Sequence, residues 1–340
     1  MNLRLQLKYL IANFLQNTGL LKYALGNFAT NNFLILMYHR VLDTVPIECQ
    51  IQPGMYVLSK TFEKHIVYLK QHFTITDLST LSSLPYSRIK NTKPFCALTF
   101  DDGWFDFYKN AFPVIKKHNV PATIFLPTAY IGTKKWFWTD QVAYLYQKNR
   151  LNVDSFEYDL GEFEYLKHLI NLNKNAKNFD KIISQLKLEK EETINQIINN
   201  NLRKLDDLNL SLNEPAFLSW WQVCNMHQSG LVSFGSHTTN HKILTLLNHD
   251  QVHKELMESI DILLSKKLVE PHFIPFCYPN GNYDNNLISL VAKNGHHLAV
   301  TTKRGRNTPG TNMFELKRIG MHEDVSCSSS MLGCRLLGIF

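Results

Sequence analysis

Two groups of residues in this chain have types and spacing that could bind a metal ion and activate water. The first is the pair Asp101 and Asp102, which follows an apolar run and precedes Gly103. Two neighbouring aspartates at the end of a strand project differently, so one carboxylate can bind a metal while the other faces a substrate. Because Asp and Gly are also common turn formers, Asp-Asp-Gly taken alone is equally well explained as a plain turn.

The second group is the histidine pair His237 and His241. Their spacing of four places both imidazoles on one face of a helical turn. Such a pair is half of a divalent-metal site, and Asp102 could supply the third ligand. Two histidines and one carboxylate leave coordination positions open, which is typical of a catalytic site rather than a structural one. With 14 histidines in the chain, one such pair can also arise by chance.

The elements that position these groups are predicted to be buried strands. Residues 95–100 and 232–235 are short apolar runs that end just before the aspartates and the histidine pair. Similar runs cover residues 33–41, 121–126 and 273–278, and helical patterns separate them. Strands that alternate with helices predict parallel strands with helices outside. Folds of this kind gather their chemistry at the strand exits.

Length, composition and charge narrow the classes of protein to consider. A chain of 340 residues with 44% hydrophobic content can bury the core of one large domain or two smaller ones. The net charge of +7 is spread along the chain, and nothing resembles a nucleic-acid-binding module, so we expect no nucleic-acid partner. The six cysteines lack a C-x-x-C spacing, and several lie in apolar runs. This favours buried free thiols and a reducing compartment.

The first residues of the chain have a helical pattern of their own. No stretch reaches the roughly 18 apolar residues of a spanning helix, and residues 1–35 do not form a clean signal peptide. Apolar residues follow an amphipathic pattern beside Arg4 and Lys8, namely Leu5, Tyr9, Leu10 and Phe14. Such a helix could lie on a membrane surface, although packing on the domain is the commoner use. We therefore expect a cytoplasmic protein, with peripheral membrane association as an alternative. The oligomeric state is not predicted.

The motifs T-F-D-D-G and S-H-T-T-N-H, in this order, resemble the first two motifs of the polysaccharide deacetylase family, carbohydrate esterase family 4 with its NodB-type homology domain. The likeness continues over most of the chain, through Leu36–Val41, Thr61–His65, Pro121–Leu126, Leu218–Trp221 and Tyr278–Gly281. The resemblance implies an α/β fold, a distorted (β/α)7-type barrel with metal and substrate at the C-terminal ends of the strands. It also implies hydrolysis of an N-acetyl or O-acetyl group of a glycan.

Between about residues 143 and 213 the composition changes. Lys, Asn, Glu, Leu and Ile dominate, Gly and Pro nearly vanish, and apolar residues recur at helical spacing. This segment is predicted to be a helical insertion in the barrel. We expect an N-terminal amphipathic segment over residues 1–33, a deacetylase-like barrel over 34–325 that contains the insertion, and a C-terminal tail over 326–340.

Carried onto this sequence, the resemblance assigns roles to individual residues. Asp102, His237 and His241 would hold the metal, and Asp101 would be the general base. Two histidines and an aspartate suit Zn²⁺ best, and Co²⁺, Ni²⁺ or Mn²⁺ would also fit. The metal would polarise the acetyl carbonyl and activate water. The oxyanion would be stabilised by a backbone N–H near Asn280, in the segment that starts at Tyr278.

The third motif of the family departs from its usual form in this chain. It normally carries an arginine that orients the base, together with a tyrosine. The corresponding positions here are Cys277 and Asn280. Arg318, in a later apolar segment, is a candidate replacement for the missing arginine.

The general acid of the family is a histidine that closely follows a late strand in an L-x-H pattern. The best match is His322, and Glu323 and Asp324 lie near enough to raise the pKa of its imidazole by their charge. The alternative is an exposed histidine in an acidic turn. Earlier in the chain, His39 could line the site, although a buried core histidine is equally plausible.

The sequence thus predicts a metal-dependent hydrolase that removes an acetyl group from an N-acetylated sugar of a glycan or a lipid-linked glycan precursor. An envelope glycan modified before export would suit a cytoplasmic enzyme. Two alternatives stay open. Loss of the third-motif arginine supports a catalytically silent relative that binds glycans. An amidohydrolase acting on a small non-sugar amide is the other, because fold and metal do not fix the substrate.

Overall fold

The computed structural model describes most of the chain, which divides into two compact units. The described residues are 3–26, 32–83, 93–151, 176–189, 192–196, 198–199 and 215–340. The first unit consists of Met1–Asp43, Tyr56–Thr133 and Phe217–Phe340, and the second of Thr44–Met55 and Lys134–Ala216. Each unit has a hydrophobic core of its own.

A closed parallel barrel forms the centre of the first unit. Its strands are β1 (Phe33–Tyr38), β5 (Phe95–Phe100), β6 (Ala122–Leu126), β7 (Val232–Ser236), β8 (Pro275–Cys277), β9 (Leu298–Arg304) and β10 (Leu316–Gly320). All neighbouring strands pair in parallel, and β1 pairs with both β10 and β5, which closes the ring. The short strand β4 (Thr74–Ile75) pairs with the start of β5. These seven closed strands confirm the predicted distorted (β/α)7-type barrel.

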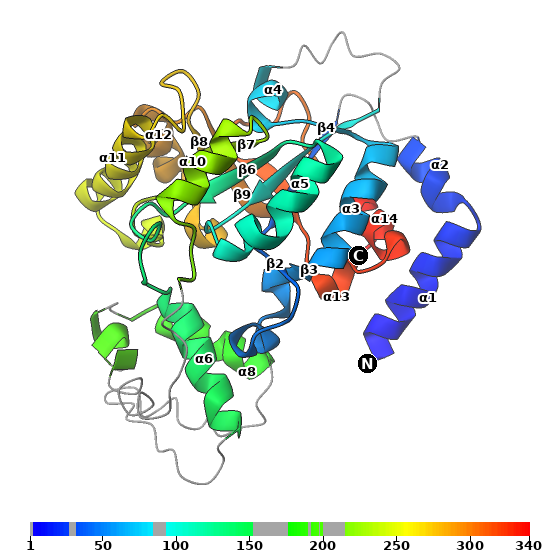
Figure 1. Ribbon diagram of the computed structural model, residues 1–340, viewed down its shortest axis with the longest axis horizontal. Coiled ribbons are helices and arrows are strands. Elements are labelled where there is room, and N and C mark those ends of the chain that lie inside the picture. The colour runs from blue at the N-terminus through cyan, green and yellow to red at the C-terminus, as the bar shows by residue number, and fades with distance from the viewer. Residues whose placement is uncertain are drawn as a thin grey trace. The chain divides into compact units, whose positions relative to one another are not determined.

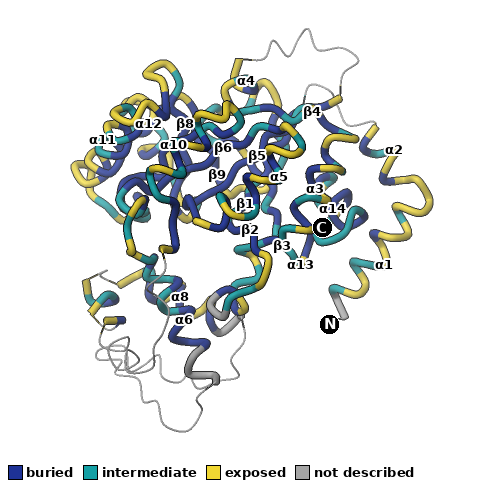
Figure 2. Tube along the Cα trace, in the orientation of Figure 1, coloured by how far each residue is buried: buried dark blue, intermediate teal, exposed yellow. Residues whose placement is uncertain are grey.

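Helices surround the barrel on its outside, as Figure 1 shows. They are α3 (Ser59–His72), α4 (Leu78–Ser83), α5 (Phe112–His118), α10 (Trp220–Gln228), α11 (His249–Ser265) and α12 (Asn285–Lys293). Side chains cap several of these helices: Ser219 and Asn248 each form a capping box with a glutamine, and Asp284 caps α12. The strands lie between the barrel interior and the helices, so most of their residues are buried (Figure 2).

Short elements connect the strands and helices of the first unit. They are the parallel pair β2 (Arg40–Leu42) and β3 (Tyr56–Leu58), the π-helical turn η4 (Phe107–Ala111), and the 3-10 turns η6 (Leu244–Leu246) and η7 (Pro279–Gly281). The pair β2–β3 continues from the end of β1. It therefore lies at the C-terminal end of the barrel strands, where the predicted site residues are also found.

The two ends of the chain pack against each other on the barrel. Helices α1 (Leu3–Asn17) and α2 (Leu20–Gly26) contact α14 (Ser329–Leu337), which follows the short helix α13 (Glu323–Ser326). Ala12, Leu21, Met331 and Cys334 form a buried cluster between them. Residues 326–340, treated above as a tail, therefore contain a helix whose side chains are largely buried. Among the described residues, no helix is both long enough and apolar enough to span a bilayer.

The second unit is mainly helical. Its elements include α6 (Trp138–Leu151), α8 (Ala176–Leu186) and the 3-10 turns η1 (Ile47–Ile51) and η2 (Pro53–Met55). Its core contains Ile51 and Phe179. Ile182 and Leu186, which belong to the predicted helical insertion, lie in α8, where both residues are buried. Residues 152–175, 190–191, 197 and 200–213 of the predicted insertion lie outside the described residues.

A buried histidine, His65 on α3, connects the barrel to α13. Its Nδ1 accepts a hydrogen bond from the Tyr38 hydroxyl at 3.1 Å, and its Nε2–H donates to the Ser326 carbonyl at 2.6 Å. These donor and acceptor roles are those of a neutral imidazole with its proton on Nε2. Burial lowers the pKa of His65 to about 4, although the Ser326 carbonyl opposes the shift.

His65 is expected to make the protein less stable in mild acid. In the unfolded chain the imidazole takes up a proton near its ordinary pKa, whereas the folded chain resists protonation until about pH 4. The contribution of His65 is thus present above the unfolded pKa and is lost as the pH falls toward 4. From pH 7.5 to pH 5 the free energy of unfolding should fall by about 2 kcal/mol through this residue. Urea titrations of wild type and His65→Gln at both pH values check this, and equal pH dependence in both proteins would contradict it.

Candidate active site

The aspartate pair lies where β5 leaves the barrel, on a strained turn. Asp102 has a φ of 73° and Gly103 a φ of 66°, so two successive residues adopt the left-handed conformation. A Cβ on Gly103 would also lie 2.8 Å from a methyl carbon of Leu126, which only glycine avoids. Left-handed backbone at a non-glycine residue is costly and is found mostly at functional sites. The turn directs both carboxylates into buried positions at the end of the barrel.

The two histidines lie on the loop that follows β7. The prediction that they share a helical turn is wrong, because Thr238 and His241 have positive φ angles of 65° and 56°. The loop is instead held by local hydrogen bonds: the Thr238 hydroxyl accepts from the His241 backbone N–H at 3.0 Å. Glu255 of α11 accepts from the Asn240 backbone N–H at 2.7 Å. The folded loop still brings the imidazole rings of His237 and His241 together, with centroids 4.7 Å apart.

Asp102, His237 and His241 meet in the geometry of a metal-binding group. The Oδ1 atom of Asp102 lies 3.4 Å from Nε2 of His237 and 3.3 Å from Nε2 of His241. One ligand atom from each residue falls within 4.8 Å of the others. Burial opposes the charge on Asp102, but hydrogen bonds with His237 and His241 outweigh burial and hold the pKa of this carboxyl well below its usual range. Two imidazole nitrogens and an ionised carboxylate fit a divalent cation, with positions left open.

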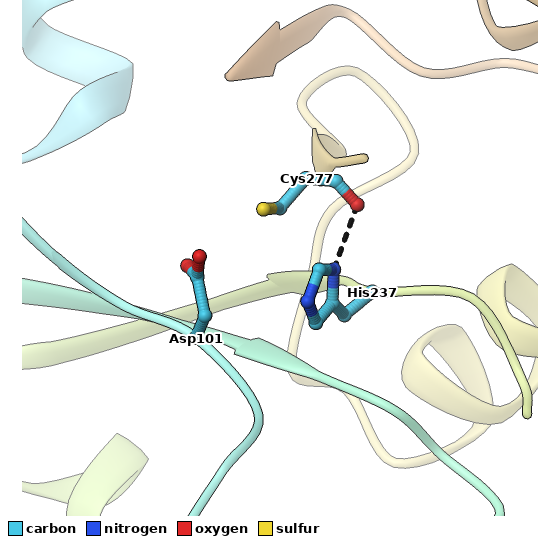
Figure 3. Close-up of side chains that lie close together, drawn as sticks. All are labelled: Asp101, His237 and Cys277. Atoms are coloured by element: carbon cyan, nitrogen blue, oxygen red, sulfur yellow. Dashed lines mark hydrogen bonds between the residues drawn. The ribbon is translucent and has the colours of Figure 1, made fainter. Parts of the chain in front are cut away.

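Hydrogen bonds with other residues orient two of these ligands, His237 and Asp102. Nδ1–H of His237 donates to the Cys277 carbonyl at 2.8 Å (Figure 3). Nε2 is therefore the ring nitrogen that faces Oδ1 of Asp102. The indole N–H of Trp104 donates to Oδ2 of Asp102 at 3.0 Å, so Oδ1 remains available to the histidines. Contacts of this kind fix the tautomer and direction of metal ligands.

Asp101 is held by Arg318, which reaches it from β10. Nη1 and Nη2 of the guanidinium each donate to one carboxylate oxygen at 2.7 Å. Both residues are buried, and Arg318 also donates to the Thr301 carbonyl and to the Cys277 sulfur. Burial opposes ionisation of Asp101, but the charge and hydrogen bonds of Arg318 outweigh it and lower the pKa of Asp101. Arg318 thus occupies the place for which it was considered above, beside the predicted base.

The small thiol at position 277 makes room for this pairing. Figure 3 shows the Cys277 sulfur on the side of the Asp101 carboxylate, with His237 close by. Nη2 of Arg318 lies 3.2 Å from that sulfur. The arginine that contacts the base therefore comes from β10, while β8 contributes a side chain short enough to leave space for it.

His39 belongs to the same cluster, although it was only one of several histidines considered from the sequence. Its Nε2 lies 3.9 Å from Oδ2 of Asp101, and its side chain is partly exposed. The reason is the register of β1 and β5, in which Tyr38 pairs with Phe100. The next residue on each strand, His39 and Asp101, then leaves the barrel at the same place. The end of an apolar run in both segments is the signal that relates them.

His322 has different partners. Its Nδ1 is bound to the Asp324 carboxylate, and its Nε2 lies 3.5 Å from a guanidinium nitrogen of Arg335 on α14. The neighbouring Glu323 points to β3 and α3, where it accepts from the Leu58 backbone N–H and the Thr61 hydroxyl. The described contacts of the His322 ring are therefore with the C-terminal helices, and they do not include Asp101 or the two histidines of the metal group.

In the segment predicted to bind the oxyanion, Tyr278 is buried whereas Asn280 is exposed. The Tyr278 hydroxyl donates to the Phe314 carbonyl at 3.1 Å, and its ring is buried and stacks on Tyr283. Asn280 is exposed in η7 and has a φ of 57°. Gly281 allows this turn to lie against β9, because a Cβ there would come within 2.0 Å of the Thr302 hydroxyl oxygen.

Comparison with known proteins decides the family. The sequence profile of the polysaccharide deacetylase family matches residues 88–299. A Bacillus subtilis (strain 168) protein, YxkH, which is named as a polysaccharide deacetylase, is 32% identical over 300 residues, covering 87% of this chain and 73% of that protein. The chain belongs to the polysaccharide deacetylase family. It is therefore a hydrolase that removes acetyl groups from a glycan.

Other relatives of this deacetylase agree with the sequence and the fold. A Staphylococcus aureus (strain N315) poly-β-1,6-N-acetyl-D-glucosamine N-deacetylase is 31% identical over 162 residues, which cover 44% of this chain and 53% of that enzyme. The Streptococcus pyogenes deacetylase PplD in complex with acetate superposes with a TM-score of 0.57 at 19% identity, over 89% of this chain and 97% of that one. IcaB from Ammonifex degensii also gives 0.57, at 17% identity, over 90% and 97%.

Trp104 is not a predicted metal ligand, but its contact with Asp102 is expected to affect metal binding. The Arg40 guanidinium lies 4.5 Å from the Trp104 ring centroid and pairs with the buried Asp106 at 2.7 Å, so the indole is fixed from behind. Trp104→Phe removes the N–H that orients Asp102, together with part of the buried ring, and keeps an aromatic side chain at this position. We expect a rise of at least about tenfold in the Kd for Zn²⁺, the usual effect of losing such a contact. Competition with a chromogenic chelator measures it. Trp221→Phe on the exposed face of α10 is the matched control, and an equal Kd in the two variants would contradict the role.

Proposed function

We propose that this chain is a metal-dependent N-deacetylase of an N-acetylated sugar in a glycan or lipid-linked glycan precursor. The observation that carries the proposal is the pairing of Asp101 with Arg318, next to the group Asp102, His237 and His241. A base kept ionised beside three convergent metal-ligand atoms suits hydrolysis by an activated water. The S. aureus relative is named for poly-β-1,6-N-acetyl-D-glucosamine, so β-1,6-linked N-acetylglucosamine oligomers are the first substrate to test.

In this proposal Asp102, His237 and His241 hold the metal. Zn²⁺ suits these ligands best, and Co²⁺, Ni²⁺ or Mn²⁺ would also fit. A bound divalent cation supplies positive charge that polarises the acetyl carbonyl and lowers the pKa of water. The fit rests on the donor set itself, because the His237–Cys277 and Trp104–Asp102 contacts leave Nε2 of His237 and Oδ1 of Asp102 as the atoms that face each other.

Asp101 acts as the general base. Its carboxylate stays ionised because Arg318 lowers its pKa, so it can take a proton from the attacking water. The two hydrogen bonds from the guanidinium also fix the orientation of the Asp101 carboxylate, so the base is held in position before the substrate binds. The oxyanion is stabilised by a backbone N–H at the Tyr278–Asn280 turn, in keeping with its place at the end of β8.

The geometry favours His39 over His322 as the general acid. His39 lies 3.9 Å from the base at the strand ends, whereas the His322 ring is bound to Asp324 and Arg335. A proton donor must reach the leaving amine of the sugar, and the acetyl carbon is attacked next to Asp101. We therefore assign proton donation to His39 and keep His322 as the rival.

This assignment predicts unequal effects of two alanine substitutions. His39→Ala should lower acetate release from an N-acetylated sugar by about 10²-fold, because the amine leaves only when protonated. His322→Ala should stay within a few-fold of wild type. On 4-nitrophenyl acetate, whose leaving group needs no proton, His39→Ala should keep most of its activity. Loss of activity on both substrates in His39→Ala, or a larger effect of His322→Ala, would overturn the assignment.

The function itself is tested by acetate release from a panel of acetylated substrates. Wild type and His237→Ala are compared on β-1,6-linked N-acetylglucosamine oligomers, other N-acetylated glycans and small acetamides, each after chelation and after addition of Zn²⁺. Release that needs both the metal and His237 supports the proposal. Release from acetamides alone would make the chain an amidohydrolase. Metal binding without release from any substrate would favour the silent glycan-binding relative, which the Arg318–Asp101 pair argues against.

Two further expectations from the sequence stay proposals. We propose a cytoplasmic location, supported by six free cysteines, most of them buried. Cell fractionation tests it. We also keep the division into an N-terminal segment over residues 1–33, a barrel over 34–325 with the insertion over about 143–213, and a tail over 326–340. Limited proteolysis tests that division.

A further inference from the structure

Helix α1 is apolar on two opposite faces. At 100° per residue, Leu5, Tyr9 and Ala12 lie on one face of the helix. This face packs on α14, where Ala12 is fully buried and the Tyr9 hydroxyl is bound to Cys327. The amphipathic pattern predicted from the sequence combined residues of both faces, since Leu10 and Phe14 belong to the other one. Packing on the domain therefore accounts for only half of the apolar surface of α1.

The opposite face of α1 carries large apolar side chains that remain exposed. Leu7, Leu10, Ile11 and Phe14 follow the i, i+3, i+4, i+7 spacing of one continuous stripe. Leu20 and Tyr23 extend the stripe onto α2, and the six side chains are between 40% and 73% exposed. We call these six residues the outer face. Figure 2 shows exposed residues along the length of α1 and α2. Monomeric soluble proteins rarely leave a contiguous apolar stripe of this kind in water.

The charges around the outer face have a single sign. Helices α1 and α2 contain Arg4, Lys8 and Lys22 and no acidic residue, and the first acidic residue of the chain is Asp43. Lys22 also lies close to Lys93 and His72: burial lowers the pKa of His72, and the charges of Lys93 and Lys22 lower it further. The Nζ of Lys8 lies 5.3 Å from the ring centroid of Phe340, which follows α14. The two helices that carry the apolar stripe thus have a net positive charge.

We propose that the outer face docks this deacetylase on the surface of a membrane that contains anionic phospholipids. An apolar stripe with basic residues and aromatic rings is what an interfacial helix presents to lipid: the apolar side chains enter the headgroup boundary, and the basic residues meet lipid phosphates. Phe14 and Tyr23 are of the residue types that suit this boundary. The face that packs on α14 keeps the helix attached to the barrel, so docking brings the whole first unit to the lipid surface.

The same charges disfavour a second copy of the chain as the occupant. In a two-fold dimer through the outer face, the same surface patch meets itself, so the two basic helices of each copy would approach those of the other. Like charges brought together while apolar surface is buried oppose the association. An anionic lipid surface has the complementary charge.

Vesicle flotation with the full-length protein tests the proposal. Vesicles of phosphatidylcholine with roughly 30% phosphatidylglycerol are compared with pure phosphatidylcholine, at low and high salt. Wild type should float with the anionic vesicles and release at high salt. The double variant Leu10→Glu and Phe14→Glu should bind them at least about tenfold more weakly, because two apolar side chains no longer enter the lipid. Leu188→Glu changes an 80% exposed leucine of the second unit and should bind like wild type.

Two readouts separate docking from other causes. Acetate release from a short soluble substrate should be unchanged in the double variant, which shows that the barrel is intact. Wild type that fails to float, or a double variant that floats as well as wild type, would overturn the proposal. Self-association of wild type that the double variant abolishes, without vesicle binding, would also overturn it and assign the outer face to a second copy.

Discussion

Asp101→Asn is expected to lower the rate of acetate release by about 10³-fold while metal affinity stays within a few-fold of wild type. The amide cannot take a proton from water, but it retains the size of the carboxyl group and one acceptor for Arg318. The contacts that join Asp102 to His237, His241 and Trp104 are direct, so Asn at position 101 leaves them in place. Steady-state kinetics at saturating Zn²⁺ and a chelator competition measure the two quantities. A variant that keeps a tenth of the activity would remove Asp101 from the role of base.

A second buried aspartate provides the matched control. Asp106 pairs with the Nε of Arg40 at 2.7 Å and accepts from the Val41 backbone N–H, so it is a buried carboxylate with an arginine partner, like Asp101. Asp106→Asn therefore also weakens a buried ion pair, but it leaves the base in place. At saturating metal this variant should keep most of its activity. If both asparagine variants lose activity equally, the loss belongs to the stability of the barrel and not to proton transfer.

Arg318→Met is expected to lower the free energy of unfolding by about 3–5 kcal/mol, the usual cost of leaving one partner of a buried ion pair alone. The guanidinium lies inside the barrel and contacts β5, β8 and β9 as well as its own strand. The double variant Asp101→Asn with Arg318→Met removes both charges and should recover part of the loss. Urea unfolding of the single and double variants measures this coupling. No recovery in the double variant would mean that packing, and not charge, accounts for the cost.

The same substitution should move the pH dependence of the reaction. Arg318 lowers the pKa of Asp101, while burial alone would raise it. Without the guanidinium the base becomes protonated at a higher pH, so the acidic limb of the kcat/KM profile should shift upward. Refolded variant with an unshifted acidic limb would show that a different group titrates there.

The sequence predicted the barrel well because its signals are local. Apolar runs ending in polar residues mark β1, β5 and β7, and the helices between them require parallel strands. Closure of the ring was expected only from the family resemblance, since it depends on the pairing of β1 with β10, whose registers no local pattern specifies. The sequence could not predict that only one face of α1 is buried, because this too depends on contacts with a distant part of the chain. A helical pattern shows that a face is apolar, but not whether another helix covers it.

For the candidate site, the sequence predicted which residues take part, but not how their side chains are oriented. Asp102, His237 and His241 do converge, yet the reason given for the histidine pair was wrong, because left-handed residues replace the expected helical turn. Arg318 could be considered because a cation was missing from the third motif. His39 could not be preferred over His322, since its approach to Asp101 results from strand register. Motif spacing carries no information about which neighbours a side chain meets across the barrel.

The salt link between Asp101 and Arg318 joins β5 to the last strand of the barrel, and this has a consequence for synthesis. While the chain emerges from the ribosome, β5 is complete long before β10 exists, so the base is made without its partner and the ring is still open. The catalytic carboxylate becomes fixed only when β10 pairs with β1 and places the guanidinium inside. Nascent chains that end before Leu316 therefore lack an assembled site, and the enzyme acquires its chemistry only after β10 has been made.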